Sequence, residues 1–499
     1  MKQYAREGCL PGTRVDVVDF ISAWVAHPSK DQKILWLHGL AGSGKSTLST
    51  TVANLFRQTN RLGAFMFFNR NESNPGLVVP TLAYSLALYD GRIGDAISAV
   101  VKDNQNIANE NIYSQFKKLL LEPLSSLVDL QLEGPIVVVL DAMDECGGPG
   151  ERKPLLKVLA EEFPRLPSFL RVIVASRPDS DIKYQFESKR HILPYQLDIT
   201  SKVTRKDIEL FFRYRMAEVR AKNPSLFLPV EWPGEQQIQA LAERASGLFI
   251  WASTACNYID GHDPEERLIT LLQADMGLDA TSALDTLYTT ALESAGRSTD
   301  LAFGADFRII MGTLLVLRNS LSPSALIELL AVTVNKARRL KSTISQLGSV
   351  LYSGSVVRIL HPSFADFLLD PNRCKSDIWF IDLMLHKIRV AHNCLDRLSG
   401  FLGYNVCNLS LSTKAQASLP EDIAYACSFW VEHVCMITDV TSIADKLETF
   451  LFDHLLHWFE AMSILKRSKD TTNMIRGLRD WHTVRARVFS NARVLLTFV

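Results

Sequence analysis

Residues 34–52 read ILWLHGLAGSGKSTLSTTV, and this stretch decides the fold. An apolar run at 34–37 is typical of a buried strand, and the residues from Lys45 onward contain few helix breakers. Strand, glycine-rich turn and helix therefore follow in the order that a phosphate-binding loop requires. Eight residues spell G-x-x-x-x-G-K-S, the P-loop pattern: Gly39, Leu40, Ala41, Gly42, Ser43, Gly44, Lys45 and Ser46.

The residue types of this pattern explain how it would bind a nucleotide. Glycines let the backbone curl, so that successive N–H groups and the amino end of the helix point at an anion. Lys45 would reach the β- and γ-phosphates, and the Ser46 hydroxyl would bind Mg²⁺. We count the next residue, Thr47, with the nucleotide-binding group. The alternative is a glycine-rich turn that merely precedes a helix.

The composition of the chain sets limits on its partners. With 499 residues the chain is long enough for about three domains. Lys+Arg and Asp+Glu each number 54, so no net charge favours nucleic acid or an anionic membrane. The eight cysteines include no C-x-x-C pair, and no apolar run reaches the length of a membrane span. We expect a soluble cytoplasmic protein. The segment 466–493 is locally basic; we expect a solvated helical face there, and contact with RNA or acidic lipid is the alternative.

Four short apolar runs predict the core of the first half of the chain. They lie at 34–37, 63–68, 135–140 and 171–175, and helical stretches separate them. Short buried strands that alternate with helices are typical of a parallel sheet covered on both faces. The fold class predicted is therefore α/β, of the P-loop NTPase type.

Acidic residues follow the third of these strands, in the sequence VVVLDAMDEC. Asp141 closes the strand, where a carboxylate would hold Mg²⁺, usually through water. Asp144 and Glu145 lie on the following turn, where a carboxylate can orient or deprotonate an attacking water. The alternative is a buried strand that ends in a solvated acidic turn.

A single arginine follows the fourth strand. Arg177, in VIVASRPDSD, comes just after 171–175, at the carboxyl edge where parallel sheets collect their ligands. A guanidinium at that edge can contact a γ-phosphate with two hydrogen bonds. As an isolated feature it would be a surface charge, so the hypothesis depends on the residues around it.

The second half of the chain is predicted to be helical. After residue 200 segments with a period of 3.6 residues dominate, and from residue 307 three helices precede two short strands, which suggests a winged helix. The predicted divisions are a lead-in at 1–33, a nucleotide-binding domain at 34–200, a helical domain at 201–300, a winged helix at 301–371 and a C-terminal helical domain at 372–499.

Five segments of the chain together resemble one family, the NACHT domains of the STAND class of signalling NTPases. The form is the one common in fungal proteins, of the nephrocystin-3-like N-terminal type, and it is similar to animal NLR proteins. The segments span most of the chain and are GLAGSGKST, VVVLDAMDEC, VIVASRP, RASGLFIWA and ILHPSFADFLLD.

The resemblance implies an ADP/ATP switch. The winged helix would pack on the nucleotide domain in a closed ADP state and be released when ATP allows the protein to form homo-oligomers, with an effector or sensor protein as a further partner. His361 matches a winged-helix histidine that touches the ADP β-phosphate, although a histidine that only satisfies a strand-to-helix turn is the alternative. Arg14, in Gly12-Thr13-Arg14, resembles the lead-in beside the adenine.

Two positions depart from the family pattern. Related proteins often carry Gly-x-Pro, with the proline against adenine, where this chain has Gly247-Leu248-Phe249. Ala142 stands where many relatives have glycine, a small change that should leave the carboxylates in place.

Three functions fit these features. The leading hypothesis is a signalling NTPase that binds Mg-ATP, hydrolyses it slowly and couples it to domain opening. The alternatives are a scaffold that binds nucleotide without hydrolysis and a small-molecule kinase. For the kinase, the sequence does not indicate a pocket for a phosphate acceptor. Adenine is the expected base, because 335–338 lacks the aspartate of a guanine-binding N-K-x-D segment. For two other candidate metal sets, packing roles are favoured: Asp453, His454 and His457, and Cys427, His433 and Cys435.

Overall fold

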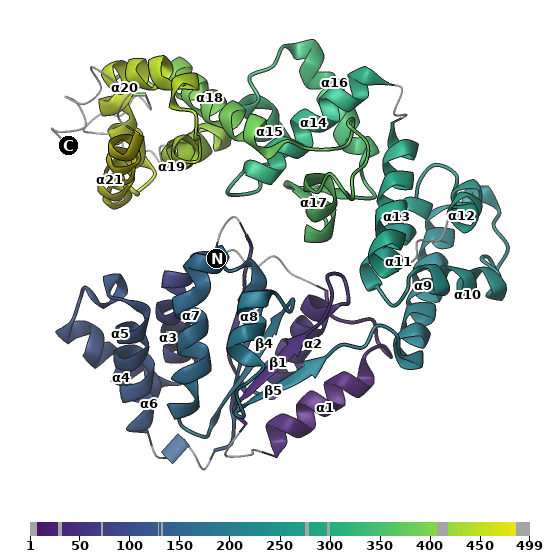
Figure 1. Ribbon diagram of the computed structural model, residues 1–499, viewed down its shortest axis with the longest axis horizontal. Coiled ribbons are helices and arrows are strands. Elements are labelled where there is room, and N and C mark those ends of the chain that lie inside the picture. Colours follow the sequence, from purple (N-terminus) through teal and green to yellow (C-terminus); the bar gives the residue numbers. More distant parts are fainter. Residues whose placement is uncertain are drawn as a thin grey trace. The chain divides into compact units, whose positions relative to one another are not determined.

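The structure is a computed structural model, shown in Figure 1. It describes residues 7–27, 32–70, 73–127, 129–130, 133–274, 279–296, 300–406 and 418–485. The chain forms two compact units, residues 1–286 and 287–499, and the boundary falls inside helix α13 (Ala280–Ala295). The finer division into five domains stays a prediction.

The first unit is built on a parallel sheet of five strands in the order β2-β3-β4-β1-β5. Strand β1, which leads into the P-loop, lies between β4 and β5. The α/β fold predicted from the sequence is therefore confirmed. The strands are β1 (Ile34–His38), β2 (Leu62–Phe67), β3 (Ile136–Asp141), β4 (Leu170–Ser176) and β5 (Ile192–Gln196).

Helices cover both faces of the sheet, because alternate strand residues point to opposite faces and most of those in the inner strands are apolar. Leu35 and Leu37 pack with α1 (Val15–Ala26) and α2 (Lys45–Gln58). Ile34 and Trp36 pack in the core of the other face, visible in Figure 1 on the side of α3 and α7. The helices there are α3 (Val78–Tyr89), α4 (Gly91–Asp103), α5 (Ile112–Phe116), α6 (Glu122–Ser125), α7 (Pro149–Glu161) and α8 (Ser180–Phe186).

Strand β5 is the one strand of this sheet that the sequence pattern did not predict. It is an edge strand, and its side chains are buried and solvated in turn, so it gives no continuous apolar run. It also contains Pro194, which lies beside Trp36 of β1. Proline lacks the N–H of an interior ladder and is tolerated at an edge. Because Pro194 and the alternating exposure interrupt the apolar pattern, the sequence did not indicate this strand.

Helices complete the first unit. The region after residue 200 is helical, as the sequence predicts, and α9 packs on α10 and α11. Helix α12 was not predicted, although Asp263 caps it and Pro264 is its first residue. The bounds are α9 (Lys202–Lys222), α10 (Glu235–Arg244), α11 (Phe249–Ile259) and α12 (Pro264–Gln273).

The second unit has the predicted order of three helices and a two-stranded antiparallel sheet. These are α14 (Leu301–Val316), α15 (Pro323–Leu329), α16 (Val334–Gln346), β6 (Leu351–Ser353) and β7 (Val357–Ile359). Five more helices follow, namely α17 (Pro362–Leu369), α18 (Leu383–Phe401), α19 (Glu421–Cys435), α20 (Ala444–Ile464) and α21 (Ser468–Arg485).

The C-terminal features singled out in the sequence lie in this helical region. The basic segment 466–493 is helical in α21 and extends beyond the described residues after 485. His454 stacks on Phe450 with ring centroids 5.9 Å apart, and His433 is bound to the Tyr425 hydroxyl. Within the described ranges, no three His, Cys, Asp or Glu side chains come together in a way that could hold a metal ion. Of the helices described, none combines the length and apolar character needed to cross a membrane.

Candidate functional site

The P-loop lies between β1 and α2, and its glycines have conformations that other residues rarely adopt. Gly42 has φ +78° and Gly44 has φ +93°. A Cβ on Gly42 would lie only 1.9 Å from Cγ2 of Ile250, in α11. Both backbone freedom and space therefore require glycine at position 42. The loop places the amino end of α2 at the carboxyl edge of the sheet.

Lys45, the first residue of α2, is 9% exposed. Its Nζ donates hydrogen bonds to the carbonyls of Gly39 at 2.7 Å and Leu40 at 2.8 Å. Burial lowers the pKa of Lys45 to about 8, although Asp144 raises it. The ammonium is therefore held inside the loop, among acidic groups that compensate its charge only in part.

Asp141 lies at the end of β3 and is fully buried. The Ser49 hydroxyl donates to its Oδ1 at 3.2 Å. Ser46 is one turn before Ser49 on α2, so both serines lie on the side of the helix that faces Asp141. Thr47, by contrast, is exposed. A serine hydroxyl and a carboxylate are oxygen ligands of the kind that Mg²⁺ prefers, so this donor set fits the metal.

The acidic turn after β3 begins with a strained residue. Ala142 has φ +58° and ψ +45°, a left-handed conformation that costs an alanine about 1–2 kcal/mol and that glycine adopts freely. The turn then closes with a hydrogen bond from Glu145 N to the Ala142 carbonyl at 2.8 Å. The alanine thus fits at this position. Compared with glycine it adds backbone strain but does not alter the course of the main chain.

The carboxylates of the turn have different surroundings. Asp144 accepts from Arg177 N at 3.0 Å through Oδ1 and pairs with Arg177 Nε at 3.2 Å through Oδ2. The Asp144 side chain is 5% exposed, so this pair is well shielded from water. Glu145 is also buried, at 8% exposure. Asp144 therefore holds Arg177 in position, and Glu145 is a second buried carboxylate on the same turn.

Arg14 joins the P-loop to the helices that follow the sheet. Its Nη2 donates to the Ser43 carbonyl and its Nη1 to Thr204 Oγ1, both at 2.9 Å. The backbone N–H of Arg14 donates to Asp207 Oδ2 at 3.0 Å, and the guanidinium lies 5.0 Å from the centroid of the Phe249 ring. Arg14 is therefore a connection between three segments far apart in the sequence.

The segment at 247–250 also touches the P-loop. The Ile250 N–H donates to the Gly42 carbonyl at 3.1 Å, and a Cβ on Gly44 would be 3.7 Å from the Phe249 ring. Gly247 has φ +78°, and a Cβ there would lie 1.9 Å from the Ile199 carbonyl oxygen. The chain thus brings Phe249 to the loop at the place where the resemblance led us to expect proline.

Two buried polar atoms at this loop suggest how a ligand would fit. In the part of the chain that the structure describes, neither Ser43 Oγ nor Arg14 Nε has a hydrogen-bond partner. Burial without a partner costs a polar group about 1–3 kcal/mol, which a bound acceptor or donor would recover. With the glycine cradle and the Asp141 region, these residues fit a Mg-nucleotide.

Comparison with known proteins agrees with this geometry. Residues 19–177 match the family described as Nephrocystin 3, N-terminal. The chain is also 23% identical over 538 residues to the vegetative incompatibility protein HET-E-1 of Podospora anserina. Over these residues the chain is similar to this family, in agreement with the NACHT resemblance of its sequence. The fungal form expected from the sequence agrees with this relative.

The matched relative is much longer than this chain. The alignment covers 98% of the chain but 38% of HET-E-1, so the chain spans less than half the length of that relative. A STAND protein with a tetratricopeptide repeat sensor from Pyrococcus horikoshii superposes at TM-score 0.44 and 11% identity, covering 97% of this chain and 60% of that one. Cdc6p from Pyrobaculum aerophilum gives TM-score 0.33 and 11% identity over 76% of this chain and 95% of its own.

The structure brings most of the predicted site residues of the first unit together at the carboxyl ends of β1, β3 and β4. The charged groups that act on Lys45 are Asp144, Arg177, Asp141 and Glu145. His361 belongs to the second unit, where it caps α17 and its Nδ1 accepts from Ser363 N at 3.1 Å. Its contact with a nucleotide stays a prediction.

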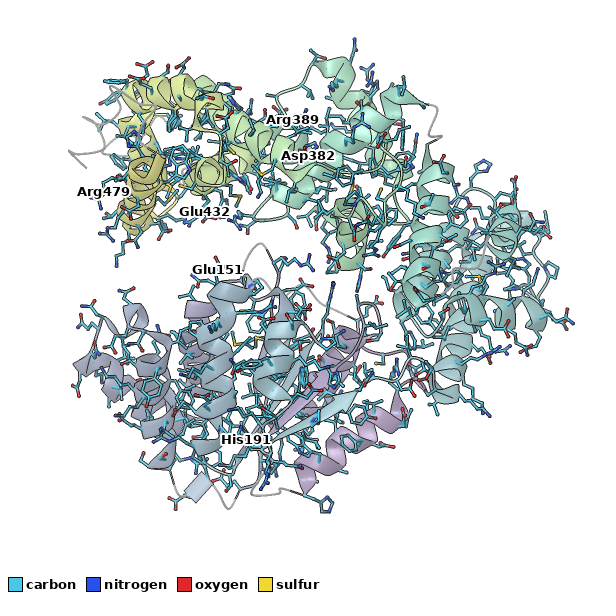
Figure 2. All side chains as sticks on the ribbon, in the orientation of Figure 1. Glu151, His191, Asp382, Arg389, Glu432 and Arg479 are labelled. Atoms are coloured by element: carbon cyan, nitrogen blue, oxygen red, sulfur yellow. The ribbon has the colours of Figure 1, made fainter. Side chains whose placement is uncertain are left out.

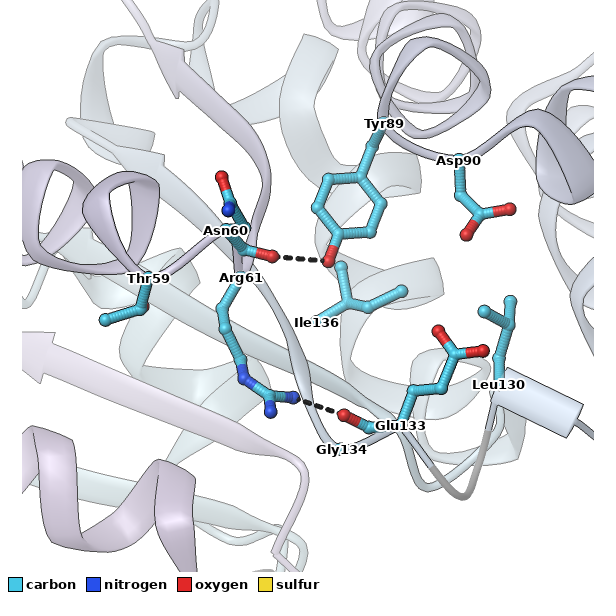
Figure 3. A pocket seen from close by; sticks show the side chains of 9 residues that line it. All are labelled: Thr59, Asn60, Arg61, Tyr89, Asp90, Leu130, Glu133, Gly134 and Ile136. Carbon is cyan, nitrogen blue, oxygen red and sulfur yellow. Dashed lines mark hydrogen bonds between the residues drawn. The ribbon is translucent and has the colours of Figure 1, made fainter.

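A pocket of about 170 Å³ lies elsewhere on the first unit (Figure 3). Arg61 immediately precedes β2 and Ile136 begins β3, so the pocket is at the amino ends of the strands, opposite the P-loop. Arg61 donates to the Glu133 carbonyl at 2.7 Å and the Tyr89 hydroxyl to the Asn60 carbonyl at 2.8 Å. These polar groups bind each other, and the candidate site is the P-loop edge.

Sequence reasoning missed several residues of the site. Thr204, Asp207 and Ile250 come from the helices after the sheet, and their own sequence carries no motif. Ser49 could have been found, because it lies one turn after Ser46 on the same helix face. Arg152, which contacts the acidic turn, gave no signal at all.

Proposed function

We propose that this chain is a nucleotide-switched signalling NTPase, which binds Mg-ATP through the P-loop and couples the nucleotide to domain opening and self-assembly. The observation that carries the proposal is the convergence of Lys45, Asp141 and the Asp144–Arg177 pair at one edge of the sheet. A structural glycine turn would need no such partners.

Each residue has a role in binding. The N–H groups of residues 39–46 and the amino end of α2 would bind the phosphates, with Lys45 at the β- and γ-phosphates. Ser46 and Asp141 would hold Mg²⁺, which when bound neutralises phosphate charge. Arg14 and Phe249 would flank the base and ribose, in place of the proline of related proteins.

We assign hydrolysis to the acidic turn and to Arg177. Glu145 would orient or deprotonate the attacking water, since it is buried and its charge acts on Lys45 of the loop. Arg177 would contact the γ-phosphate, and Asp144 would hold its guanidinium in position through the 3.2 Å pair. Turnover would be slow and would reset the switch.

The switch would act through the contacts that link the loop to the helices. Arg14 and the Ile250–Gly42 hydrogen bond tie the P-loop to α9 and α11, so a change in the loop would reach these helices. His361 would hold the ADP state through the β-phosphate, as the family resemblance implies. ATP would then release the winged helix and allow homo-oligomers to form.

We extend this proposal to the biological role. HET-E-1 is a vegetative incompatibility protein, so we propose that this chain acts in fungal self/non-self or stress signalling with an effector or sensor protein as partner. A cytoplasmic location is supported by the cysteines, since the seven described thiols form no disulfide. The five domains predicted from the sequence are the parts that would move.

The experiment that tests the proposal identifies nucleotide in the purified protein and measures its mass in solution with ADP and with a non-hydrolysable ATP analogue. We expect bound nucleotide, and a larger assembly with the analogue. Lys45→Ala should abolish the bound nucleotide, and a variant that retains as much as the parent would contradict the proposal. A parent that binds ATP but releases no phosphate would favour a non-hydrolysing scaffold.

A further inference from the structure

Arg152 lies in the first turn of α7, immediately after the acidic turn. Gly147 has φ +72°, and the Gly148 N–H donates to Glu151 Oε2 at 2.8 Å, which caps the helix. Glu151 is labelled in Figure 2 at the end of α7 remote from His191, the residue just before β5. This turn reverses the chain, so that Arg152 faces back to the acidic turn. Arg152 is 2% exposed, unusual for an arginine.

All five N–H groups of Arg152 are engaged within the described structure. Nε and Nη2 donate to the two carboxylate oxygens of Asp181 at 2.7 and 2.8 Å, and Nη2 also donates to Asp179 at 3.0 Å. Nη1 donates to the carbonyl of Asp144 and, at 3.5 Å, to that of Gly147. The guanidinium has no donor left for a ligand, so its role is to hold protein groups together.

The two segments that Arg152 joins are the ones that carry the candidate chemistry. Asp144 lies on the acidic turn after β3, and Asp179 and Asp181 lie just after Arg177, beyond β4. Arg177 already bridges to the Asp144 carboxylate, and Arg152 bridges to the Asp144 carbonyl. Two arginines thus bind the same residue of the turn, Arg177 at the side chain of Asp144 and Arg152 at its main chain.

We propose that Arg152 is a positioning residue for hydrolysis, which fastens the acidic turn to the segment after β4 and so fixes Arg177 and Glu145 relative to the P-loop. The inference rests on the proposed function of that edge. Without Arg152, two adjacent carboxylates would lose their shared cation and the turn would lose its main-chain anchor. Arg177 would then pair with Asp144 on a turn that has lost this anchor.

Amide hydrogen exchange tests the positional part of this proposal without reference to hydrolysis. In Arg152→Met, peptides that cover 177–186 and 142–147 should exchange at least tenfold faster, while a peptide over 39–46 changes less than twofold. Arg152→Lys keeps the charge but lacks the forked donors of the guanidinium, so its exchange rates should be intermediate. This variant also provides the test if Arg152→Met does not fold. Unchanged exchange in both segments would overturn the proposal.

A matched control is Arg92→Met. Arg92 also bridges two carboxylates, Asp90 and Glu133, each at 2.7 Å, but its side chain is 43% exposed and lies away from the P-loop edge. We expect this variant to exchange and turn over like the parent. Equal effects of the two methionine variants would show a general response to losing an arginine bridge and would also overturn the proposal.

Kinetics test the catalytic part. Arg152→Met should lower the single-turnover rate of ATP hydrolysis at least tenfold, while the Kd for ADP changes less than threefold. The double variant Arg152→Met/Arg177→Met should be no slower than Arg177→Met alone, because Arg152 acts through the same group. Additive losses, or a parallel loss of ADP affinity, would make Arg152 a purely structural residue. A parent without hydrolysis would remove the proposed catalytic function, while the exchange data would still decide whether Arg152 fastens the turn.

Discussion

The N–H of Ile250, the second residue of α11, donates a hydrogen bond over 3.1 Å to the carbonyl of Gly42 in the middle of the P-loop. The contact is close on both sides, since a Cβ on Gly42 would run into the Ile250 side chain. A phosphate-binding loop and a helix some two hundred residues later are therefore in direct contact, and the loop cannot change shape without acting on α11.

Gly42→Ala should lower the free energy of unfolding by about 2–4 kcal/mol, because the new methyl group combines a left-handed conformation with a clash at Ile250. Urea denaturation of the ligand-free protein measures this loss. Gly91→Ala is the control, because a Cβ on Gly91 meets nothing within 4 Å. A loss below 0.5 kcal/mol in Gly42→Ala, as expected for the control, would mean that α11 does not confine the loop.

Nucleotide affinity should fall as the pH rises above about 8, the pKa to which burial brings Lys45. Below that pH Lys45 is charged and can meet a phosphate, whereas above it binding must take up a proton, at a cost approaching tenfold in Kd per pH unit. The Kd for ADP at pH 7, 8 and 9, with proton uptake from calorimetry, measures this coupling. Lys45→Arg stays charged and should show no such slope; an equal slope in both proteins would assign it to another group.

The same pKa predicts an effect on the free protein. The folded pKa of Lys45 lies below its unfolded value, so the unfolded chain binds more protons between about pH 8 and 10.5. The stability penalty is therefore full below pH 8 and is removed as the pH rises through that window. Relative to Lys45→Met, the parent should gain up to about 3 kcal/mol between pH 8 and 10.5 in urea denaturation. A constant difference between the two would contradict the buried charge.

Arg14→Met should destabilise the first unit by about 2–4 kcal/mol, because it removes two hydrogen bonds from a buried cation and its contact with Phe249. Thr204→Val removes only one of the hydrogen-bond partners and should cost about 1 kcal/mol. A double-mutant cycle by urea denaturation should give a coupling of at least 0.5 kcal/mol. If the losses of unfolding free energy in the two single variants simply add in the double variant, the hydrogen bond between Arg14 and Thr204 does not contribute to stability.

The two carboxylates of the acidic turn should give different phenotypes. Glu145→Gln should still bind ATP but hydrolyse it about 10²–10⁴-fold more slowly, as expected for loss of a general base. Asp144→Asn weakens the hold on Arg177, so it should reduce the preference for an ATP analogue over ADP. Single-turnover hydrolysis and the two Kd values separate these effects. Identical defects in both variants would mean that the turn acts as a unit.

Acid should destabilise the second unit through His433. Burial, and secondly Arg318, lower the pKa of His433 to about 3, whereas the unfolded value is 6.5. The unfolded chain thus binds more protons below pH 6.5, and the stability present above that pH is lost at up to about 1.4 kcal/mol per pH unit as the pH falls towards 3. His433→Gln can still accept from the Tyr425 hydroxyl and should lack this slope. The free energy of unfolding of both proteins from pH 7 to 5 provides the measurement, and parallel curves would exclude His433.

The parts of the site that were predicted correctly are those that local sequence specifies. Strand β1, the glycine turn and α2 follow each other in the chain, and Asp141 closes a run of buried residues. The edge strand β5 was missed because Pro194 and alternating exposure gave no apolar run. Local pattern therefore predicts buried strands well and edge strands poorly.

The partners of the site residues could not be predicted, because tertiary contacts bring them together. Arg152 and Asp181 are polar residues at the starts of helices, with nothing in the sequence to show that they pair. Thr204 and Asp207 likewise accept hydrogen bonds from Arg14 only because the fold brings α9 next to Arg14. Nothing in the sequence indicated that Asp144 pairs with Arg177, which follows a different strand.

The hydrogen bonds of Arg14 bear on how this protein can be divided. The family match covers residues 19–177, but Arg14 and its partner Thr204 both lie outside that range, as does Ile250. A fragment trimmed to the matched residues would therefore lack the groups that bind the carbonyls of Ser43 and Gly42. Its P-loop would keep every residue of the motif but lose the support of its main chain. A fragment for separate expression should therefore begin before Arg14 and extend to the end of the compact unit at residue 286.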